Sequence, residues 1–217
     1  KAALSCDDFK LDCLTKALDS IEGSETKWVA PPIFHDEQHS ISIRLIYWPA
    51  FYSNNPHKHK TWGVTGVFHN SLDVFTYELL SEPTRLLKQR QIAASADEVG
   101  FIMPDCIHNI SNPSGEVSIS IHIFNNLRDI SSSAENAVWY PSPKKFDLSQ
   151  GLKERALIAM TAVLSRIQSE RSLALLARII EIGERDVAFK AICAMSALSK
   201  EKYKHYLTAF SNKLISV

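Results

Sequence analysis

The spacing of apolar residues changes along this chain of 217 residues, and the change restricts the folds available to it. From Trp28 onward, short runs of β-branched and aromatic residues show the alternation of half-buried strands. The clearest runs are 41–46, 65–68, 72–77, 99–103 and 117–124. Turn residues separate the runs and no helix-length segment lies between them, so the pattern predicts a mainly β, antiparallel barrel or sandwich.

Helical periods lie on both sides of this β segment. Residues 9, 13, 17 and 21 are apolar at i, i+4 spacing, and Ser5 is the expected N-cap of a helix that ends at Gly23. After Pro143, four apolar stripes follow at residues 152–167, 173–180, 187–198 and 203–214. They show no clear repeat period, which favours a helical appendage over a solenoid. The sequence therefore predicts an N-terminal helix (1–24), a barrel (25–147) and a C-terminal helical region (148–217).

The net charge of zero conceals an uneven distribution. Residues 1–147 carry 13 basic and 18 acidic side chains, whereas residues 148–217 carry 11 basic and 6 acidic ones. A neutral total argues against a nucleic-acid binder, and no apolar run approaches the roughly 20 residues that a membrane helix needs. The opposite charges predict that the helical region docks on the barrel of the same chain or of a second subunit, which would give a homodimer.

The four cysteines have no Cys-x-x-Cys spacing, so neither a zinc knuckle nor a redox pair is expected. Buried free thiols in a reducing compartment are the simpler interpretation. No signal peptide is recognisable, although the chain begins with Lys1 rather than Met. Together these features predict a cytoplasmic protein.

Three histidines stand out as candidate metal ligands. His57 and His59 are separated by one residue on an extended segment, so both imidazoles point to the same side. His108 follows at the end of a later β block, with Asn112 four residues beyond it. Three neutral imidazoles suit Fe(II), Zn, Ni or Cu and leave coordination positions open. The alternative is an ordinary basic turn, since lysines flank both members of the first pair.

A second group, His35 and His39, flanks Asp36 and Glu37. These residues could form another metal site, but a solvated loop is the expected interpretation.

Residues 41–124, nearly 40% of the chain, resemble the cysteine dioxygenase family of cupins. The motifs that carry the resemblance are a strand ending in Trp48, His57-Lys-His59, His108 with Asn112, and Ser120-Ile-His122. The resemblance implies a cupin (double-stranded β-helix, jelly-roll) barrel with Fe(II) held by His57, His59 and His108. Gly63 and Val64 stand where the general cupin motif places a glutamate, which favours a site without carboxylate, as is typical of thiol dioxygenases.

The family's Ser-His-Tyr relay is partly retained. By resemblance, Ser120 and His122 fill its first two places, and His122 is expected to hydrogen-bond substrate or bound oxygen. Phe124 fills the third place and has no hydroxyl to donate, so the relay is expected to be truncated.

The family's carboxylate-binding arginine has no counterpart, because residues 30–33 read Ala-Pro-Pro-Ile. Arg44 shares a strand face with Ile46 and Trp48. On an interior face it would need an anionic partner, either a substrate carboxylate or an acidic residue of this chain, and both remain open. The remaining expected substrate contacts are Ile46, Trp48, Trp62 and Phe124, although aromatic residues on barrel strands more often belong to the core.

The resemblance implies a mononuclear non-heme Fe(II) oxygenase that uses O2 and a small thiol or amino-acid-like substrate. Dioxygenation of a thiol would give a sulfinic acid, but the altered relay leaves room for another oxidation. Two alternatives stay open: a non-enzymatic module that binds a metal or ligand, and a cupin isomerase or lyase that uses another metal.

Overall fold

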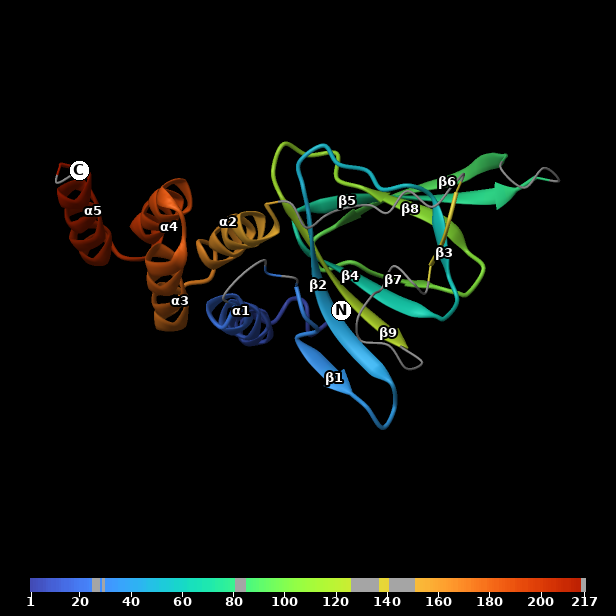
Figure 1. The fold of residues 1–217 in the computed structure, drawn as a ribbon, viewed down its shortest axis with the longest axis horizontal. Helices are drawn as coiled ribbons and strands as arrows, with labels where there is room; N and C mark the ends of the chain where they lie inside the picture. The colour runs from blue at the N-terminus through green and yellow to red at the C-terminus, as the bar shows by residue number, and fades with distance from the viewer. Residues whose placement is uncertain (25–27, 29, 81–84, 126–136, 141–150, 216–217) are drawn as a thin grey trace. The chain divides into compact units, whose positions relative to one another are not determined.

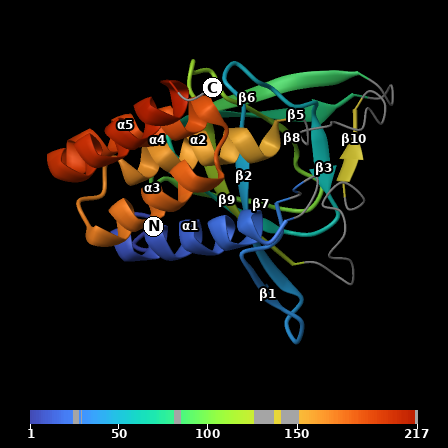
Figure 2. The same cartoon turned by 60° about the vertical axis from the view of Figure 1, so that its left-hand side comes forward.

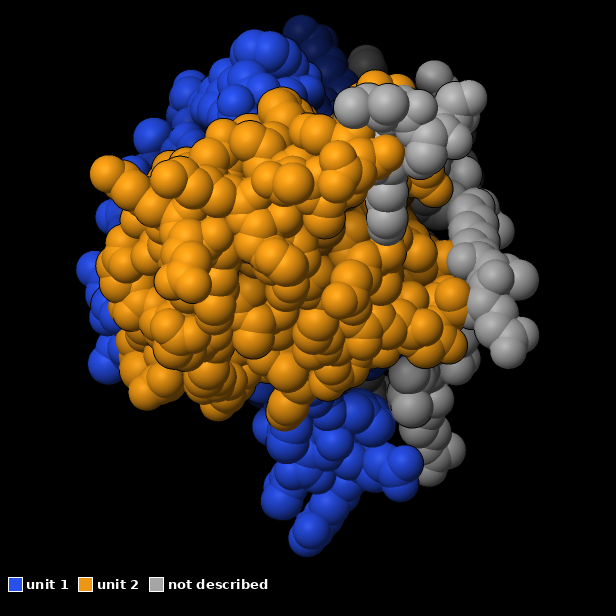
Figure 3. Space-filling model, turned by 90° about the vertical axis from the view of Figure 1, so that its left-hand side faces the viewer, with its two compact units in different colours: residues 1–5, 30–150 blue, residues 6–29, 151–217 orange. Residues whose placement is uncertain are grey.

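The computed structural model describes residues 1–24, 28, 30–80, 85–125, 137–140 and 151–215. The chain divides into two compact units, coloured blue and orange in Figure 3. The β unit comprises residues 1–5 and 30–150, and the helical unit comprises residues 6–29 and 151–217. The helical unit thus includes the N-terminal helix, which the sequence predicts as a segment of its own. The predicted border at 147/148 lies outside the described residues and stays a prediction.

Ten described strands form two five-stranded sheets in the β unit, and every pairing between them is antiparallel (Figure 1). Sheet A has the order β1-β2-β9-β4-β7, and sheet B has the order β10-β3-β8-β5-β6. Apart from the β1-β2 and β5-β6 hairpins, each strand is followed by a strand of the other sheet. This arrangement confirms the predicted mainly β, antiparallel architecture. The strands are β1 (Phe34–Asp36), β2 (Ile41–Trp48), β3 (His57–His59), β4 (Gly63–His69), β5 (Ser71–Leu79), β6 (Leu86–Ser95), β7 (Val99–Ile102), β8 (Ile107–Ser111), β9 (Ser118–Asn125) and β10 (Ala137–Trp139).

Strand register decides which side chains share one side of sheet A. Residues directly opposite one another on antiparallel strands point to the same side. Arg44 on β2 lies opposite His122 on β9. His122 also lies opposite Thr65 on β4, and Thr65 lies opposite Gly100 on β7. These four positions form one row across the sheet, which we call the sheet A row.

A buried apolar cluster joins the two sheets. Trp48 and Val67 come from sheet A, and Leu72 and Ile110 come from sheet B. Ile46 packs against this cluster. Two of the expected substrate contacts, Ile46 and Trp48, therefore contribute to the core that holds the sheets together.

The apolar alternation in the sequence does not predict strand β6. It is ten residues long and pairs only with β5 among the described strands, so it forms an edge of sheet B. Nearly all of its residues are exposed, which removes the apolar alternation that identifies half-buried strands.

The helical unit contains the five predicted helices (Figure 2). The four C-terminal apolar stripes lie on helices except for Ile167, a buried residue just beyond the end of α2, and the described stripes of α2, α3 and α4 are largely buried. The expected N-cap of the first helix is wrong: Cys6 occupies the cap position, and the Ser5 hydroxyl instead donates to the carbonyl of Ala2. The helices are α1 (Asp7–Glu22), α2 (Leu152–Leu164), α3 (Glu170–Ile182), α4 (Arg185–Leu198) and α5 (Lys200–Ile215).

Ion pairs join α1 to α3 within this unit. Arg178 on α3 lies 2.6 Å from carboxylate oxygens of both Asp19 and Glu22 on α1. Arg171, also on α3, pairs with Asp12 and Asp8. Part of the charge asymmetry between residues 1–147 and 148–217 is thus neutralised inside the helical unit, because α1 belongs to the acidic segment.

The cysteines are free thiols, but they are not uniformly buried. Cys13 is buried, Cys106 is half-buried, and Cys6 and Cys193 are exposed. Burial raises the pKa of the Cys13 thiol to about 11. The expectation of buried thiols therefore holds for Cys13 and is wrong for the two exposed residues.

None of the described helices has the length and apolar content needed to cross a membrane.

Candidate metal centre

Three histidine side chains converge on sheet B. His57 and His59 lie on β3, and His108 lies on β8 directly opposite His57. One ring nitrogen of each residue lies within 4.8 Å of those of the other two. Among the described residues, this is the group of three or more potential ligands that could hold a metal ion. The structure brings the three predicted ligands together as the strand spacing requires.

Backbone carbonyls orient two of the three imidazoles. The Nδ1–H of His57 donates to the carbonyl of Asn55, and that of His108 donates to the carbonyl of Cys106, each at 3.0 Å. Carbonyl oxygens only accept hydrogen bonds, so Nδ1 carries the proton and Nε2 keeps its lone pair. The His108 Nε2 atom is buried without a hydrogen-bond partner among the described atoms. A fixed tautomer and a buried, unpartnered ring nitrogen are features of a metal-ligating histidine.

Burial keeps these imidazoles neutral. Desolvation, followed by the nearby histidines, lowers the pKa of His57 and of His59 to about 3. Desolvation also lowers the pKa of His108. The neutral imidazole is the form that binds metal, so the cluster needs no deprotonation to accept an ion at neutral pH. The donor set therefore fits a metal cofactor.

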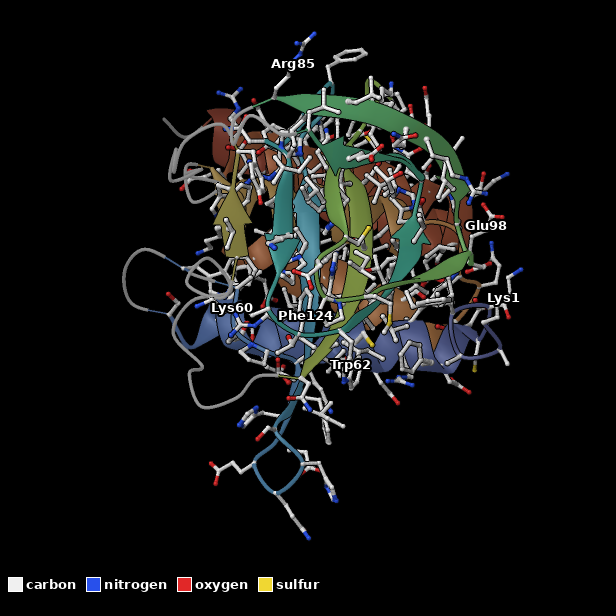
Figure 4. All side chains as sticks on the ribbon, turned by 90° about the vertical axis from the view of Figure 1, so that its right-hand side faces the viewer. Lys1, Lys60, Trp62, Arg85, Glu98 and Phe124 are labelled. Carbon is white, nitrogen blue, oxygen red and sulfur yellow. The ribbon has the colours of Figure 1, made fainter. Side chains whose placement is uncertain are left out.

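Phe124 occupies the position opposite Gly63, where the cupin motif would supply a glutamate. A Cβ atom at Gly63 would lie 3.0 Å from Phe124 Cε1. The Phe124 ring centroid is 5.4 Å from that of His59 and 5.4 Å from that of His122, so the ring lies close to both histidines. Phe124 is labelled in Figure 4. The phenyl ring presents an apolar surface beside the three-histidine cluster.

Both ring nitrogens of His122 have partners in the protein. Its Nε2 atom is 2.7 Å from the Ser120 hydroxyl, and its Nδ1 atom is 3.1 Å from the Thr65 hydroxyl. The indole N–H of Trp48 donates to the same Ser120 oxygen at 2.7 Å. The roles expected for Ser120 and His122 stay predictions, but His122 is held on both sides.

Asn112, which belongs to the motif that resembles the cysteine dioxygenase family, has a structural role. Its amide NH₂ donates to the carbonyls of Trp48, Pro49 and Glu116. These bonds fix the end of β2 and therefore the indole of Trp48.

Arg44 lies beside His122 in the sheet A row. Its guanidinium is half-buried, and desolvation lowers its pKa. One guanidinium nitrogen donates to the carbonyl of Ala30 at 3.4 Å. Binding of a substrate carboxylate by Arg44 stays a prediction, as does the substrate contact expected of Trp62, which is 38% exposed.

Two residues near the cluster escape prediction from the sequence. The Trp139 ring stacks on His57 with their centroids 4.3 Å apart, and Thr65 bonds His122. Strand alternation places Thr65 on the same side as Gly63, which is a weak signal for its position. Trp139 offers no comparable signal, because its contact depends on how the short strand β10 pairs with β3.

The second candidate site forms no described metal cluster. The His39 ring lies 2.9 Å from Asp36 Oδ2 and both side chains are solvent-accessible. Among the described residues, neither His35 nor His39 belongs to a group of three potential ligands that could hold a metal ion. His35 and Asp36 lie on strand β1, and His35 is half-buried, so the solvated loop interpretation is wrong for these two residues and holds for the turn at residues 37–40.

No family model matches the sequence, and no curated protein is significantly similar to it. Three matching solved structures each cover less than half of this chain. An oxalate oxidase in complex with glycolate is 18% identical over 46% of this chain and 46% of its own, with a TM-score of 0.36. Lactobacillus farciminis oxalate decarboxylase is 19% identical over 46% of this chain and 27% of its own, with a TM-score of 0.37. A cupin 2 conserved barrel domain protein from Rhodopseudomonas palustris is 14% identical over 44% of this chain and 59% of its own, with a TM-score of 0.36.

Proposed function

We propose that this chain is a mononuclear non-heme Fe(II) oxygenase that uses O2 to oxidise a small thiol or an amino-acid-like substrate. The observation that carries the proposal is the buried three-histidine cluster, in which carbonyl bonds leave Nε2 of His57 and His108 free to ligate. Three neutral protein ligands without a carboxylate leave coordination positions for substrate and O2.

The residues around the cluster have separable tasks in this proposal. Bound iron would supply Lewis acidity, lower the pKa of a thiol and activate O2. Phe124 would keep water away from one side of the cluster, because its apolar ring lies beside His59 with the ring centroids 5.4 Å apart. Arg44 is the proposed partner of a substrate carboxylate, since a half-buried guanidinium binds a carboxylate through charge-assisted hydrogen bonds.

The test begins with anaerobic loading of the protein with Fe(II). Metal analysis gives the iron content, and an oxygen electrode measures O2 uptake with a panel of small thiols and amino acids. We expect about one iron per chain, from the single described three-histidine cluster, and O2 uptake that depends on one class of substrate. An iron-loaded protein that consumes no O2 with any candidate would overturn the oxygenase.

A pair of variants tests the ligand assignment separately. His57→Ala should weaken metal binding by more than the roughly 10- to 100-fold that loss of an outer-shell partner costs. His39→Ala is the matched control, because His39 is an exposed histidine of the β unit outside the cluster. Full iron content in the His57 variant would contradict the assignment.

The same experiment separates the alternatives. A non-enzymatic module would bind metal but convert no candidate, whereas an isomerase or lyase would act without O2 and with another metal.

A further inference from the structure

His122 lies between the hydroxyl groups of Ser120 and Thr65. The neighbouring donors determine which atom donates and which accepts in each of these hydrogen bonds. The Trp48 indole N–H can only donate, so the Ser120 oxygen accepts at this contact. Ser120 has one hydroxyl proton and is fully buried. Among the described residues, His122 Nε2 is the acceptor that the structure offers to this proton. The opposite arrangement would leave the buried Ser120 proton without an acceptor, which is unfavourable.

This assignment fixes the tautomer of His122. If Nε2 accepts from Ser120, then Nδ1 carries the ring proton and donates to the Thr65 hydroxyl. The bonds therefore run in one direction, from Trp48 through Ser120 and His122 to Thr65. His122 therefore has no further N–H to donate to a substrate. The last proton in this series of hydrogen bonds is the hydroxyl proton of Thr65.

The surroundings of His122 favour the neutral imidazole, which this series of hydrogen bonds requires. Burial, followed by the nearby His108 and His57, lowers the pKa of His122. A protonated ring would donate from both nitrogens and would reverse the bond to Ser120. His122 lies near the three-histidine cluster, because the Phe124 ring contacts both His122 and His59 with centroid distances of 5.4 Å.

Open space lies beside Thr65, the last residue in this series of hydrogen bonds. Thr65 is half-buried and lies opposite Gly100 on β7, so both positions face the same side of sheet A. Gly100 is exposed, and a Cβ atom built on it would meet no atom within 4 Å. A small molecule can therefore approach the Thr65 hydroxyl, whereas Ser120 is fully buried and His122 is 3% exposed.

We propose that the Thr65 hydroxyl, rather than His122, donates the hydrogen bond to bound substrate, and that His122 is a positioning residue that holds Thr65. This inference rests on the proposed function. Thr65 would thereby supply the hydroxyl that Phe124 lacks, from a different strand.

Nuclear magnetic resonance of the metal-free protein tests the bond direction without any turnover. In ¹⁵N-labelled wild-type protein, we expect the proton of His122 on Nδ1 and the lone pair on Nε2. Thr65→Val removes the acceptor and should shift the Nδ1–H resonance or move the proton to Nε2, whereas Thr65→Ser should preserve the wild-type signals. A wild-type ring protonated on Nε2 would overturn the proposal, and it can be detected even if the valine variant does not fold.

Kinetics of the iron-loaded enzyme tests the substrate contact. Thr65→Val should lower kcat/KM for substrate-dependent O2 uptake by about two- to tenfold, the range for one hydrogen bond, with unchanged iron content. Thr65→Ser should restore most of this loss. Thr208→Val is the matched control, because Thr208 is an exposed residue of α5. Unchanged kcat/KM in the Thr65→Val variant would overturn the substrate contact.

The two readouts separate this inference from the proposed function. An Nδ1–H tautomer without O2 uptake on any substrate would overturn the oxygenase and the substrate contact, but it would support Thr65 as the partner that holds His122. O2 uptake with an Nε2–H tautomer would support the oxygenase and overturn the role of Thr65.

Discussion

The Trp139 indole stacks on the imidazole of His57, with ring centroids 4.3 Å apart and planes inclined by 27°. The contact follows from strand register, because Trp139 on β10 lies directly opposite His57 on β3. His57 is thus fixed from two directions, by the indole and by the Asn55 carbonyl.

Replacing this indole should weaken metal binding. Trp139→Ala removes the stack and admits water beside His57, so we expect metal affinity to fall by about 2- to 10-fold, from the 0.5–1.5 kcal/mol typical of an aromatic pair. Competition with a chelator measures the affinity. Trp139→Phe should retain most of it, and equal affinity of the alanine variant and the wild type would show that the stack does not position His57.

Only part of the histidine cluster is predictable from local geometry. His57 and His59 share a side through strand alternation, whereas their meeting with His108 depends on the pairing of β3 with β8, which the resemblance to a known family predicts and local geometry does not. The bond between Thr65 and His122 depends on the register of β4 against β9, which their separation of 57 residues does not reveal.

The helical stripes are predictable for the same local reason, whereas the position of α1 is not. Its apolar face identifies a helix, but the sequence does not say what covers that face. The ion pairs of Arg178 with Asp19 and Glu22 show that α1 packs with α3.

Gly63 is the position where a small substitution should disturb the cluster. Its Cβ would lie 3.0 Å and 3.1 Å from two carbons of the Phe124 ring, so the ring, which lies close to His59 and His122, must shift. We expect Gly63→Ala to lower the free energy of unfolding by about 1–3 kcal/mol, as is usual for overpacking. Urea denaturation measures the change.

Two further variants make this prediction specific. Gly100→Ala is the matched control, because an added methyl group there meets open space. In the Gly63→Ala background, Phe124→Leu should lower the free energy of unfolding by less than it does in the wild type, because it removes the ring atoms that clash with the added methyl group. Strictly additive effects of the two changes would contradict a clash with Phe124.

Stability of the metal-free protein should fall in mild acid. The pKa of His57 and His59 is about 3 in the folded state, mainly because both are buried, against roughly 6.5 in the unfolded chain. Above pH 6.5 neither state binds these protons, so the two groups add no pH dependence. Between pH 6.5 and 3 only the unfolded state binds them, and each group favours unfolding by up to about 1.4 kcal/mol per pH unit.

Urea midpoints of the metal-free protein at pH 7.5, 6 and 5 test this pH dependence. His57→Gln should make the fall shallower by about one proton, because glutamine does not titrate in this range. Thr208→Val, at an exposed position of α5 whose side chain does not titrate in this range, is the control and should leave the slope near the wild-type value. Parallel curves for wild type and His57→Gln would mean that His57 is not held neutral by burial.

The ion pairs between α1 and α3 should stabilise the helical unit modestly and in a salt-dependent way. Glu22, together with Asp19, raises the pKa of the Arg178 guanidinium. The Arg178 side chain is 29% exposed, so we expect Arg178→Ala to lower the free energy of unfolding by about 0.2–1 kcal/mol per pair at low ionic strength, and by less in 1 M salt.

Arg185→Ala is the matched control, because Arg185 is an exposed arginine at the start of α4. Denaturation of both variants at two salt concentrations measures the difference. An equal loss in the two variants, or a loss for Arg178→Ala that salt does not change, would show that the charges contribute nothing specific and that apolar packing of α1 holds the unit together.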